Sequence, residues 1–266
     1  MALTSQQGLA VAILIYFVPA LPISIFICFR LGIGRVWGWA CLTFFCTLRI
    51  AGAVLRIAAD NQPRRNPDQG RSGLDVAAQS LANLALMPLL LVMLELLTRI
   101  KQQLQARDPK SRSWNMHWFN STNPFIERAW FYIPIAQTAE FILGIVAFSI
   151  NSTSLRKAVF IITAVIFTLQ AYIAVVYFFE RHNYDGRDHQ TPLFAILSAP
   201  FLTLRVVYGV GHAFNSGDWL GIVGSVVMVF VMEAIVVAVY LFAATKMEPD
   251  MKKGNQELRE RETGSP

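Results

Sequence analysis

The stretch GLAVAILIYFVPALPISIFICF, residues 8–29, contains no charged side chain and decides the fold class of the chain. A helix of this length rises about 1.5 Å per residue and therefore crosses a hydrocarbon core of about 30 Å. Residues 1–7 carry no basic side chain, and the apolar stretch is longer than that of a secretory signal. We therefore expect a permanent membrane-spanning helix.

Six further stretches of the same kind follow along the chain. The 266 residues are 55% hydrophobic and 15% charged, which is not the balance of a water-soluble protein. We predict an all-α polytopic membrane protein, with a seven-helix transmembrane domain over residues 1–245 and a disordered cytoplasmic tail over residues 246–266. The predicted spans are Gly8–Phe29, Val36–Ile57, Asp75–Leu97, Trp130–Ile150, Ala158–Phe179, Leu193–Ala213 and Leu220–Ala243.

The basic residues are distributed unevenly between the two sides of these spans. Fifteen Lys and Arg residues fall on the side of the C-terminus and five on the opposite side. The positive-inside rule then places the C-terminus in the cytoplasm and the N-terminus in the lumen or outside, and we expect the endoplasmic reticulum membrane. The net charge of +6 follows from this asymmetry, so it indicates contact with anionic membrane lipids and no nucleic acid.

Several ionisable and amide side chains lie within the predicted spans, where each one needs a partner, a cavity or a function. Arg49, Asn83, Glu140 and Arg205 come from four different spans but lie at similar depths from the outer end. Glu233 lies about 6 Å deeper at the helical rise. Two arginines and two glutamates at neighbouring depths form a balanced set.

Helical spacing extends this set into polar faces. We infer a polar pocket in the luminal half, with Arg49, Asn83, Arg205, Tyr208 and His212 as substrate-binding residues. Small residues on these faces let helices approach closely. The faces are Arg49, Gly52, Ala53 and Arg56; Gln79, Ser80, Asn83 and Met87; Gln137, Glu140, Phe141 and Gly144; and Arg205, Tyr208, Gly209 and His212.

A structural role is the alternative for the same charges. Arg49–Glu140 and Arg205–Glu233 can form ion pairs that lock the bundle. A partial repeat points to another alternative, because Thr47-Leu48-Arg49 and Thr203-Leu204-Arg205 occupy matching positions on two parallel spans. Such repeats occur in transporters.

Several membrane-protein chemistries are excluded by the residues present. No lysine lies in any predicted span, so a retinal Schiff base cannot form, and no Asp-rich motif is present to hold a diphosphate through metal ions. We expect neither a metal nor another cofactor. Aromatic residues make up 12% of the chain. Aromatic faces stabilise carbocations in a dry cavity, and a buried carboxylic acid can start such a reaction by protonating an epoxide.

The run Trp37-Gly38-Trp39 leading to Thr47–Gly52, followed by Ala85–Leu90, resembles a family of fungal seven-helix integral membrane proteins over most of residues 10–245. Within that family the closest functional resemblance is to the membrane-bound terpene cyclases of fungal meroterpenoid pathways, of the ascochlorin and ascofuranone type. The resemblance implies an isomerase or lyase type of reaction in secondary metabolism, in which a terminal epoxide on a farnesylated phenol is protonated and the chain cyclises. It assigns no catalytic residue by motif.

Two glutamates are the candidate catalytic residues for this reaction. Glu140 lies level with both arginines, whereas Glu233 lies deeper among apolar residues such as Val229 and Val236. We predict that Glu233 is the general acid and that Glu140 and the arginines hold the polar head of a lipid-soluble prenylated substrate. The alternative function is a seven-helix receptor or transporter for a small amphiphile or lipid.

Overall fold

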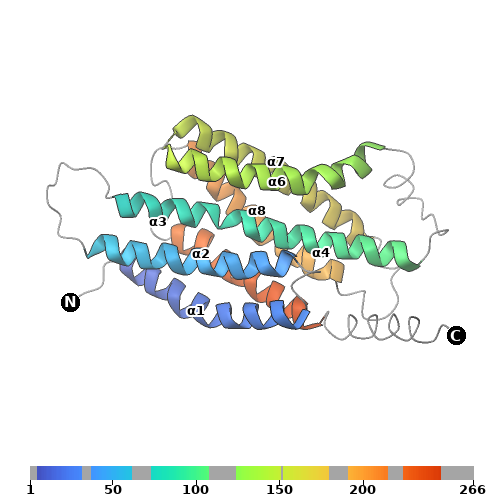
Figure 1. Cartoon of the computed structure of the whole chain (residues 1–266), viewed down its shortest axis with the longest axis horizontal. Helices are drawn as coiled ribbons and strands as arrows, with labels where there is room; N and C mark the ends of the chain where they lie inside the picture. The colour runs from blue at the N-terminus through green and yellow to red at the C-terminus, as the bar shows by residue number, and fades with distance from the viewer. Residues whose placement is uncertain are drawn as a thin grey trace.

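The computed structural model describes residues 5–31, 37–61, 73–107, 124–150, 152–179, 191–214 and 224–246. Each of these ranges is helical, and none of them contains a strand (Figure 1). The prediction of an all-α chain is therefore confirmed for the part of the chain that is described. The predicted tail lies outside the described residues, apart from Lys246.

The helical ranges correspond to the seven predicted spans, with the third span divided in two. The last range begins with a π-helix and continues as α-helix, and residues 224–246 are called the last helix below. The elements are α1 (Ser5–Leu31), α2 (Trp37–Asp60), α3 (Gly73–Leu84), α4 (Leu86–Arg107), α6 (Pro124–Ser149), α7 (Thr153–Phe179), α8 (Thr191–Phe214) and η3 (Ser225–Val231).

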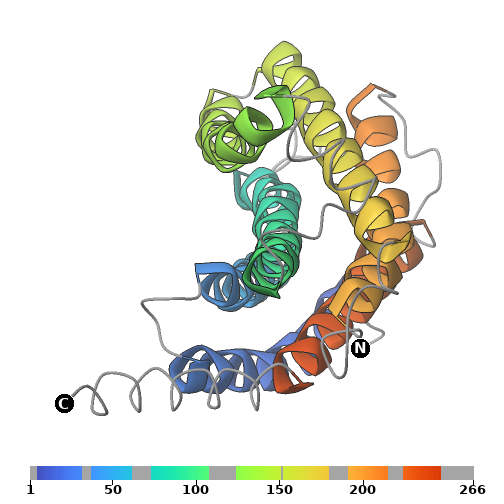
Figure 2. The ribbon, with the colours of Figure 1, turned by 90° about the vertical axis from the view of Figure 1, so that its right-hand side faces the viewer.

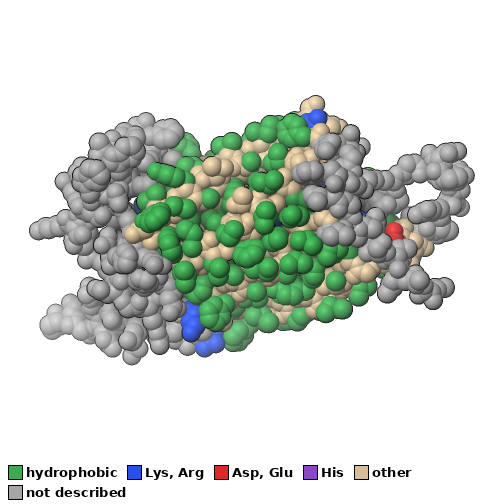
Figure 3. Space-filling model, turned by 180° about the vertical axis from the view of Figure 1, so that it is seen from behind, with side chains coloured by type: hydrophobic (Ala, Val, Ile, Leu, Met, Phe, Trp, Pro, Cys, Tyr) green, Lys and Arg blue, Asp and Glu red, His purple; other side chains and the backbone are tan. Residues whose placement is uncertain are grey.

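Six of these helical segments are long and apolar enough to cross a membrane. The seventh, α6, has a shorter apolar part, Tyr132–Ala147. Large apolar side chains such as Ile15 and Phe179, each 72% exposed, cover the outside of the bundle. Figure 3 shows hydrophobic side chains over the long middle of one face. An apolar exterior of this kind is typical of a multi-pass membrane protein.

The segment formed by α3 and α4 lies at the centre of the bundle. In Figure 2 the other helices form an arc around one side of it, from α6 and α7 through α8 and the last helix to α1 and α2. In its most apolar stretch 67% of the residues are buried, against 28% in α1 and in the last helix. The first and the last helix are in contact, because the Tyr16 hydroxyl of α1 donates a hydrogen bond to the carbonyl of Ala234 in the last helix, 2.6 Å away.

A break at Ala85 divides this central segment, which the sequence predicted as one span. Pro88 explains the break, because it has no N–H to donate to the carbonyl of Leu84 and its ring crowds that carbonyl. The helix resumes at Leu86 and continues to Arg107, beyond the predicted end at Leu97.

The last helix has a different irregularity. Its first turns, Ser225–Val231, are π-helical, and Glu233 follows two residues later. A π-helix has more residues per turn than an α-helix, so it rotates the residues that follow it relative to the α-helical pattern. The direction of Glu233 therefore cannot be obtained from an α-helical spacing that starts before the π-helix.

Candidate functional site

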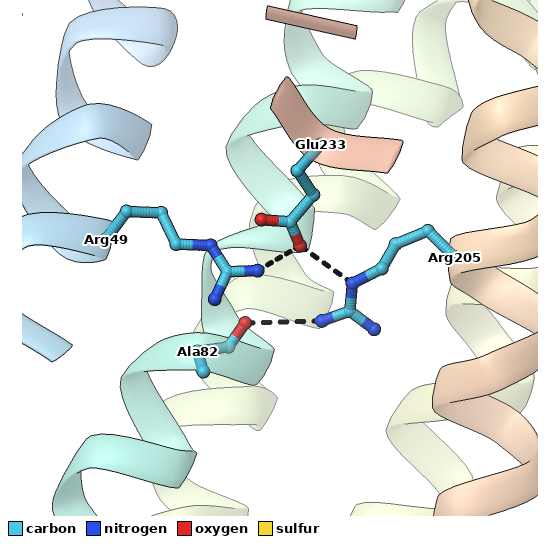
Figure 4. Close-up of polar contacts among 4 residues, drawn as sticks. All are labelled: Arg49, Ala82, Arg205 and Glu233. Atoms are coloured by element: carbon cyan, nitrogen blue, oxygen red, sulfur yellow. Dashed lines mark hydrogen bonds and ion pairs between the residues drawn. The ribbon is translucent and has the colours of Figure 1, made fainter. Parts of the chain in front are cut away.

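Two arginines and a glutamate from three helices meet inside the bundle (Figure 4). Arg205 of α8 donates from Nε to Glu233 Oε1 over 2.7 Å, and Arg49 of α2 forms an ion pair with the same oxygen. Arg205 also donates from Nη2 to the carbonyl of Ala82, 3.3 Å away in the last turn of α3. Arg49, Arg205 and Glu233 are called the arginine cluster below.

The arginine cluster is almost completely enclosed. Arg49 is 4% exposed, Arg205 is 2% exposed and Glu233 is 1% exposed. Both guanidinium groups share one carboxylate oxygen, while Arg49 Nε and Glu233 Oε2 have no hydrogen-bond partner among the described residues. The cluster therefore contains two positive charges, one negative charge and unused hydrogen-bonding capacity.

Aromatic rings line the side of the cluster that faces α1. The Arg49 guanidinium lies 5.8 Å from the centre of the Phe45 ring, a cation–π contact. Phe45 packs edge to face on Phe17, and Phe17 packs in the same way on Tyr16 and on Phe230 of the last helix. Charged and aromatic surfaces are therefore adjacent at this site.

The repeated Thr-Leu-Arg motif supplies both arginines of the cluster. The threonines of the two motifs do not contribute, because each hydroxyl donates to a carbonyl of its own helix: Thr47 to Thr43 over 3.0 Å and Thr203 to Ala199 over 2.8 Å. Of the two motifs, only Arg49 and Arg205 contact Glu233.

A second group of buried polar side chains lies between α6, α7 and α4. The Thr163 hydroxyl forms a hydrogen bond with Glu140 Oε1 and lies 3.9 Å from the sulfur of Met87. Gln170, two turns along α7, donates to the carbonyl of Leu90 over 3.4 Å. Gln137 lies one turn from Glu140 on the buried face of α6. Gln137, Glu140, Thr163 and Gln170 are called the α6–α7 seam below.

The side chains of the seam are as buried as those of the arginine cluster, but more of their polar atoms have no hydrogen-bond partner among the described residues. Its four side chains are at most 3% exposed. Both side-chain polar atoms of Gln137 have no hydrogen-bond partner among the described residues, and neither do Glu140 Oε2 and Gln170 Oε1. Glu140 forms no ion pair with any described residue. Buried polar atoms without a protein partner are places where water or a polar ligand group can bind.

The depths in the sequence predict that one pocket contains Arg49, Asn83, Glu140, Arg205 and Glu233, and this prediction is only partly correct. Arg49, Arg205 and Glu233 meet as predicted, and the predicted Arg205–Glu233 ion pair is confirmed. The predicted Arg49–Glu140 pair is wrong, because Arg49 pairs with Glu233 instead. Depth along a helix says nothing about rotation around it, and α6 presents Glu140 to α7.

The remaining predicted binding residues lie nearer the surface of the bundle. Asn83 is half-buried at the end of α3, and among the described residues no hydrogen bond joins it to the arginine cluster. Tyr208 packs edge to face on His212, which is exposed near the end of α8 and lies 3.4 Å from Gln79 of α3. These residues continue the Arg205 face of α8 to the end of the bundle.

Some site residues were not predicted. Thr163 shares a buried face with Val159, Ile166 and Gln170, and its helical spacing from Gln170 was a usable signal. The carbonyl of Ala82 had no such signal, because any residue type supplies a carbonyl. Tyr16 and Phe17 lie in an apolar stretch whose pattern does not separate lipid-facing from buried positions.

The sequence matches the family described as "Domain of unknown function (DUF7702)" over residues 3–249, so the chain belongs to that family. No curated protein and no solved structure matches the chain.

Proposed function

We propose that this member of the DUF7702 family is a membrane-embedded terpene cyclase, which cyclises an epoxidised prenylated aromatic substrate inside its helical bundle. The observation that supports this most is the separation of the two buried glutamates: two arginines hold Glu233, whereas Glu140 has no ion-pair partner among the described residues. Such a cyclase has one task at each end of its substrate. It must hold the polar head and protonate the distant epoxide.

The contacts favour Glu140 as the general acid. Glu233 accepts from both guanidinium groups through one oxygen, an arrangement that suits a carboxylate. Glu140 has the Thr163 hydroxyl as a hydrogen-bond partner and no ion-pair partner among the described residues, which suits a carboxylic acid. This exchanges the roles that the sequence favoured, and the assignment of the acid remains a prediction in either form.

In the proposed reaction Glu140 donates its proton to the epoxide oxygen, and the C–O bond breaks to leave a hydroxyl and a carbocation. The alkenes of the prenyl chain attack the carbocation in turn. The final carbocation loses a proton to the Glu140 carboxylate, which restores the acid, so the reaction is an isomerisation without a cofactor. Phe141 follows Glu140 on α6 and packs against the small core cluster that contains Met87 and Val159, so its ring offers an aromatic face to the cation.

The finer placement of the protein in the cell is part of the proposal. The fifteen basic residues on one side and five on the other support a luminal N-terminus and a cytoplasmic C-terminus in the endoplasmic reticulum. Protease treatment of sealed microsomes should remove a C-terminal tag and spare an N-terminal one. The reverse pattern would contradict this orientation.

A receptor or transporter for a small amphiphile is the second candidate. It is favoured by the two Thr-Leu-Arg motifs, whose arginines reach one carboxylate from two parallel helices. Matching motifs around a central site are a feature of transporters built from repeats.

One assay separates these two functions. Membranes from a host that expresses only this protein are incubated with an epoxidised farnesyl phenol, and the products are analysed by mass spectrometry and NMR. A cyclised isomer that is formed by the wild type and lost in Glu140→Gln supports the cyclase. Saturable binding of the same compound without conversion supports the receptor or transporter.

A further inference from the structure

We propose that the arginine cluster is a binding site for the carboxylate of an amphiphile, whose apolar body lies along the neighbouring aromatic rings. The inference rests on the proposed function for the idea that an amphiphile enters the bundle, and it adds the charge of the head group.

The charges of the cluster do not cancel. Arginine stays protonated in proteins, so Arg49 and Arg205 bring two positive charges and Glu233 brings at most one negative charge. All three side chains are buried, and no other described acid forms an ion pair with either arginine. An uncompensated charge in the interior of a membrane protein is costly. A ligand with one negative charge would neutralise the cluster.

The hydrogen-bond donors of the cluster are also in excess. Each guanidinium group has five N–H donors in a planar fork. Both forks contact Glu233 Oε1, Arg205 alone also donates to the carbonyl of Ala82, and Arg49 Nε has no hydrogen-bond partner among the described residues. A second carboxylate matches this planar arrangement because its two oxygens can accept from one fork.

The surroundings favour an amphiphile over an inorganic anion. The Phe45 ring lies against the Arg49 guanidinium, and the rings of Phe17 and Phe230 pack in turn beyond it, so the cluster borders an aromatic part of the core. On the other side, the Arg205 face of α8 leads through half-buried Tyr208 to exposed His212. A molecule with one anionic end and a long apolar body fits this change from polar to aromatic surface.

The test uses the full chain in a neutral detergent and follows thermal unfolding by tryptophan fluorescence. The probes are decanoate, its methyl ester and sodium chloride. At a decanoate concentration about a hundredfold above its Kd, we expect an unfolding midpoint on the order of 5 °C higher than without it. The ester and the chloride should give little or no shift.

Charge-changing variants connect this shift to the cluster. Arg49→Met leaves a neutral Arg205–Glu233 pair, so the variant should fold and lose the decanoate shift. Arg49→Lys retains the charge without the fork and should retain part of the shift. Arg56→Met removes an arginine on the same face of α2, outside the cluster, and should leave the shift unchanged.

Three results would overturn the carboxylate site: an equal shift with the ester or with chloride, a full shift in Arg49→Met, or no shift in the wild type. If Arg49→Met does not fold, the comparison of Arg49→Lys with Arg56→Met decides instead, and equal shifts in those two variants would also overturn the site. The cyclase proposal is tested separately. A decanoate shift without cyclisation leaves the binding site standing, whereas cyclisation without a preference for the carboxylate leaves only the cyclase.

Discussion

The arginine cluster and the α6–α7 seam lie on different sides of the central α3–α4 segment, and each contains one buried glutamate. The two glutamates differ in the charge of their partners. Glu233 and Glu140 are both 1% exposed. Glu233 has two guanidinium partners, whereas Glu140 has the Thr163 hydroxyl. Equal burial therefore does not imply an equal role, because the neighbouring charges decide whether a buried carboxyl group suits binding or proton transfer.

The same comparison distinguishes what each glutamate does for stability. A carboxylate between two arginines cannot be removed without leaving two like charges next to each other in an apolar interior. A glutamate with no charged partner can be replaced by a neutral side chain of the same shape at little cost. The two glutamine substitutions should therefore differ sharply.

The largest effect is expected at the arginine cluster. Glu233→Gln removes the negative charge that both arginines share, and we expect the free energy of unfolding to fall by about 3–5 kcal/mol. Unfolding in detergent, followed by circular dichroism, measures the change. In the double variant Arg49→Met, Glu233→Gln one fewer positive charge is left, so much of the loss should be recovered. A stable Glu233→Gln single variant would show that the cluster does not hold the bundle together.

At the seam the expected loss is one of activity. Glu140→Gln keeps the shape of the side chain but removes the transferable proton, so cyclisation of the epoxidised substrate should fall about a hundredfold or more. The unfolding midpoint should stay close to that of the wild type. Product formation per folded protein is the measurement. Full activity in Glu140→Gln would return the role of acid to Glu233.

These two regions also show how far the sequence leads. Hydropathy located each described helical range, although it joined α3 and α4 into one span, because burial and length constrain a span strongly. It placed Arg49 and Arg205 at one depth and Glu233 about 6 Å deeper. The partner of Glu140 could not be predicted, because that requires the rotation of each helix. Pro88 in the central segment and the π-helix before Glu233 both change that rotation.

Two glycines give a smaller and more local test, since one lies beside each region. A Cβ at Gly209 would lie 2.9 Å and 3.2 Å from two atoms of the Phe160 ring, next to Arg205. A Cβ at Gly144, one turn from Glu140, would lie 2.9 Å from the end of the Leu84 side chain. A leucine tip moves aside more easily than a packed ring. We expect Gly209→Ala to cost about 1–3 kcal/mol and Gly144→Ala less.

Thermal unfolding of both variants measures this difference. Equal losses of stability in the two variants would mean that both sides of the bundle accommodate an added methyl group equally well. If Gly144→Ala costs more than Gly209→Ala, the seam is the more rigid region, and water or ligand between α6 and α7 becomes difficult to accommodate.

The smallest effect is expected from the hydroxyl that contacts Glu140. Thr163 and Thr168 lie on the same helix, and each donates to the carbonyl four residues before it, over 2.9 Å to Val159 and over 2.7 Å to Ala164. Only Thr163 also reaches Glu140, whereas Thr168 is exposed. Replacing either threonine by valine keeps the shape and should change stability by about 1 kcal/mol or less.

If the hydroxyl positions the acid, Thr163→Val should lower cyclisation by roughly fivefold to tenfold, the effect of losing about one hydrogen bond, while Thr168→Val leaves it unchanged. Because the two variants lose the same hydrogen bond to the backbone, the ratio of their activities isolates the contact with Glu140, and a ratio near one would remove Thr163 from the site.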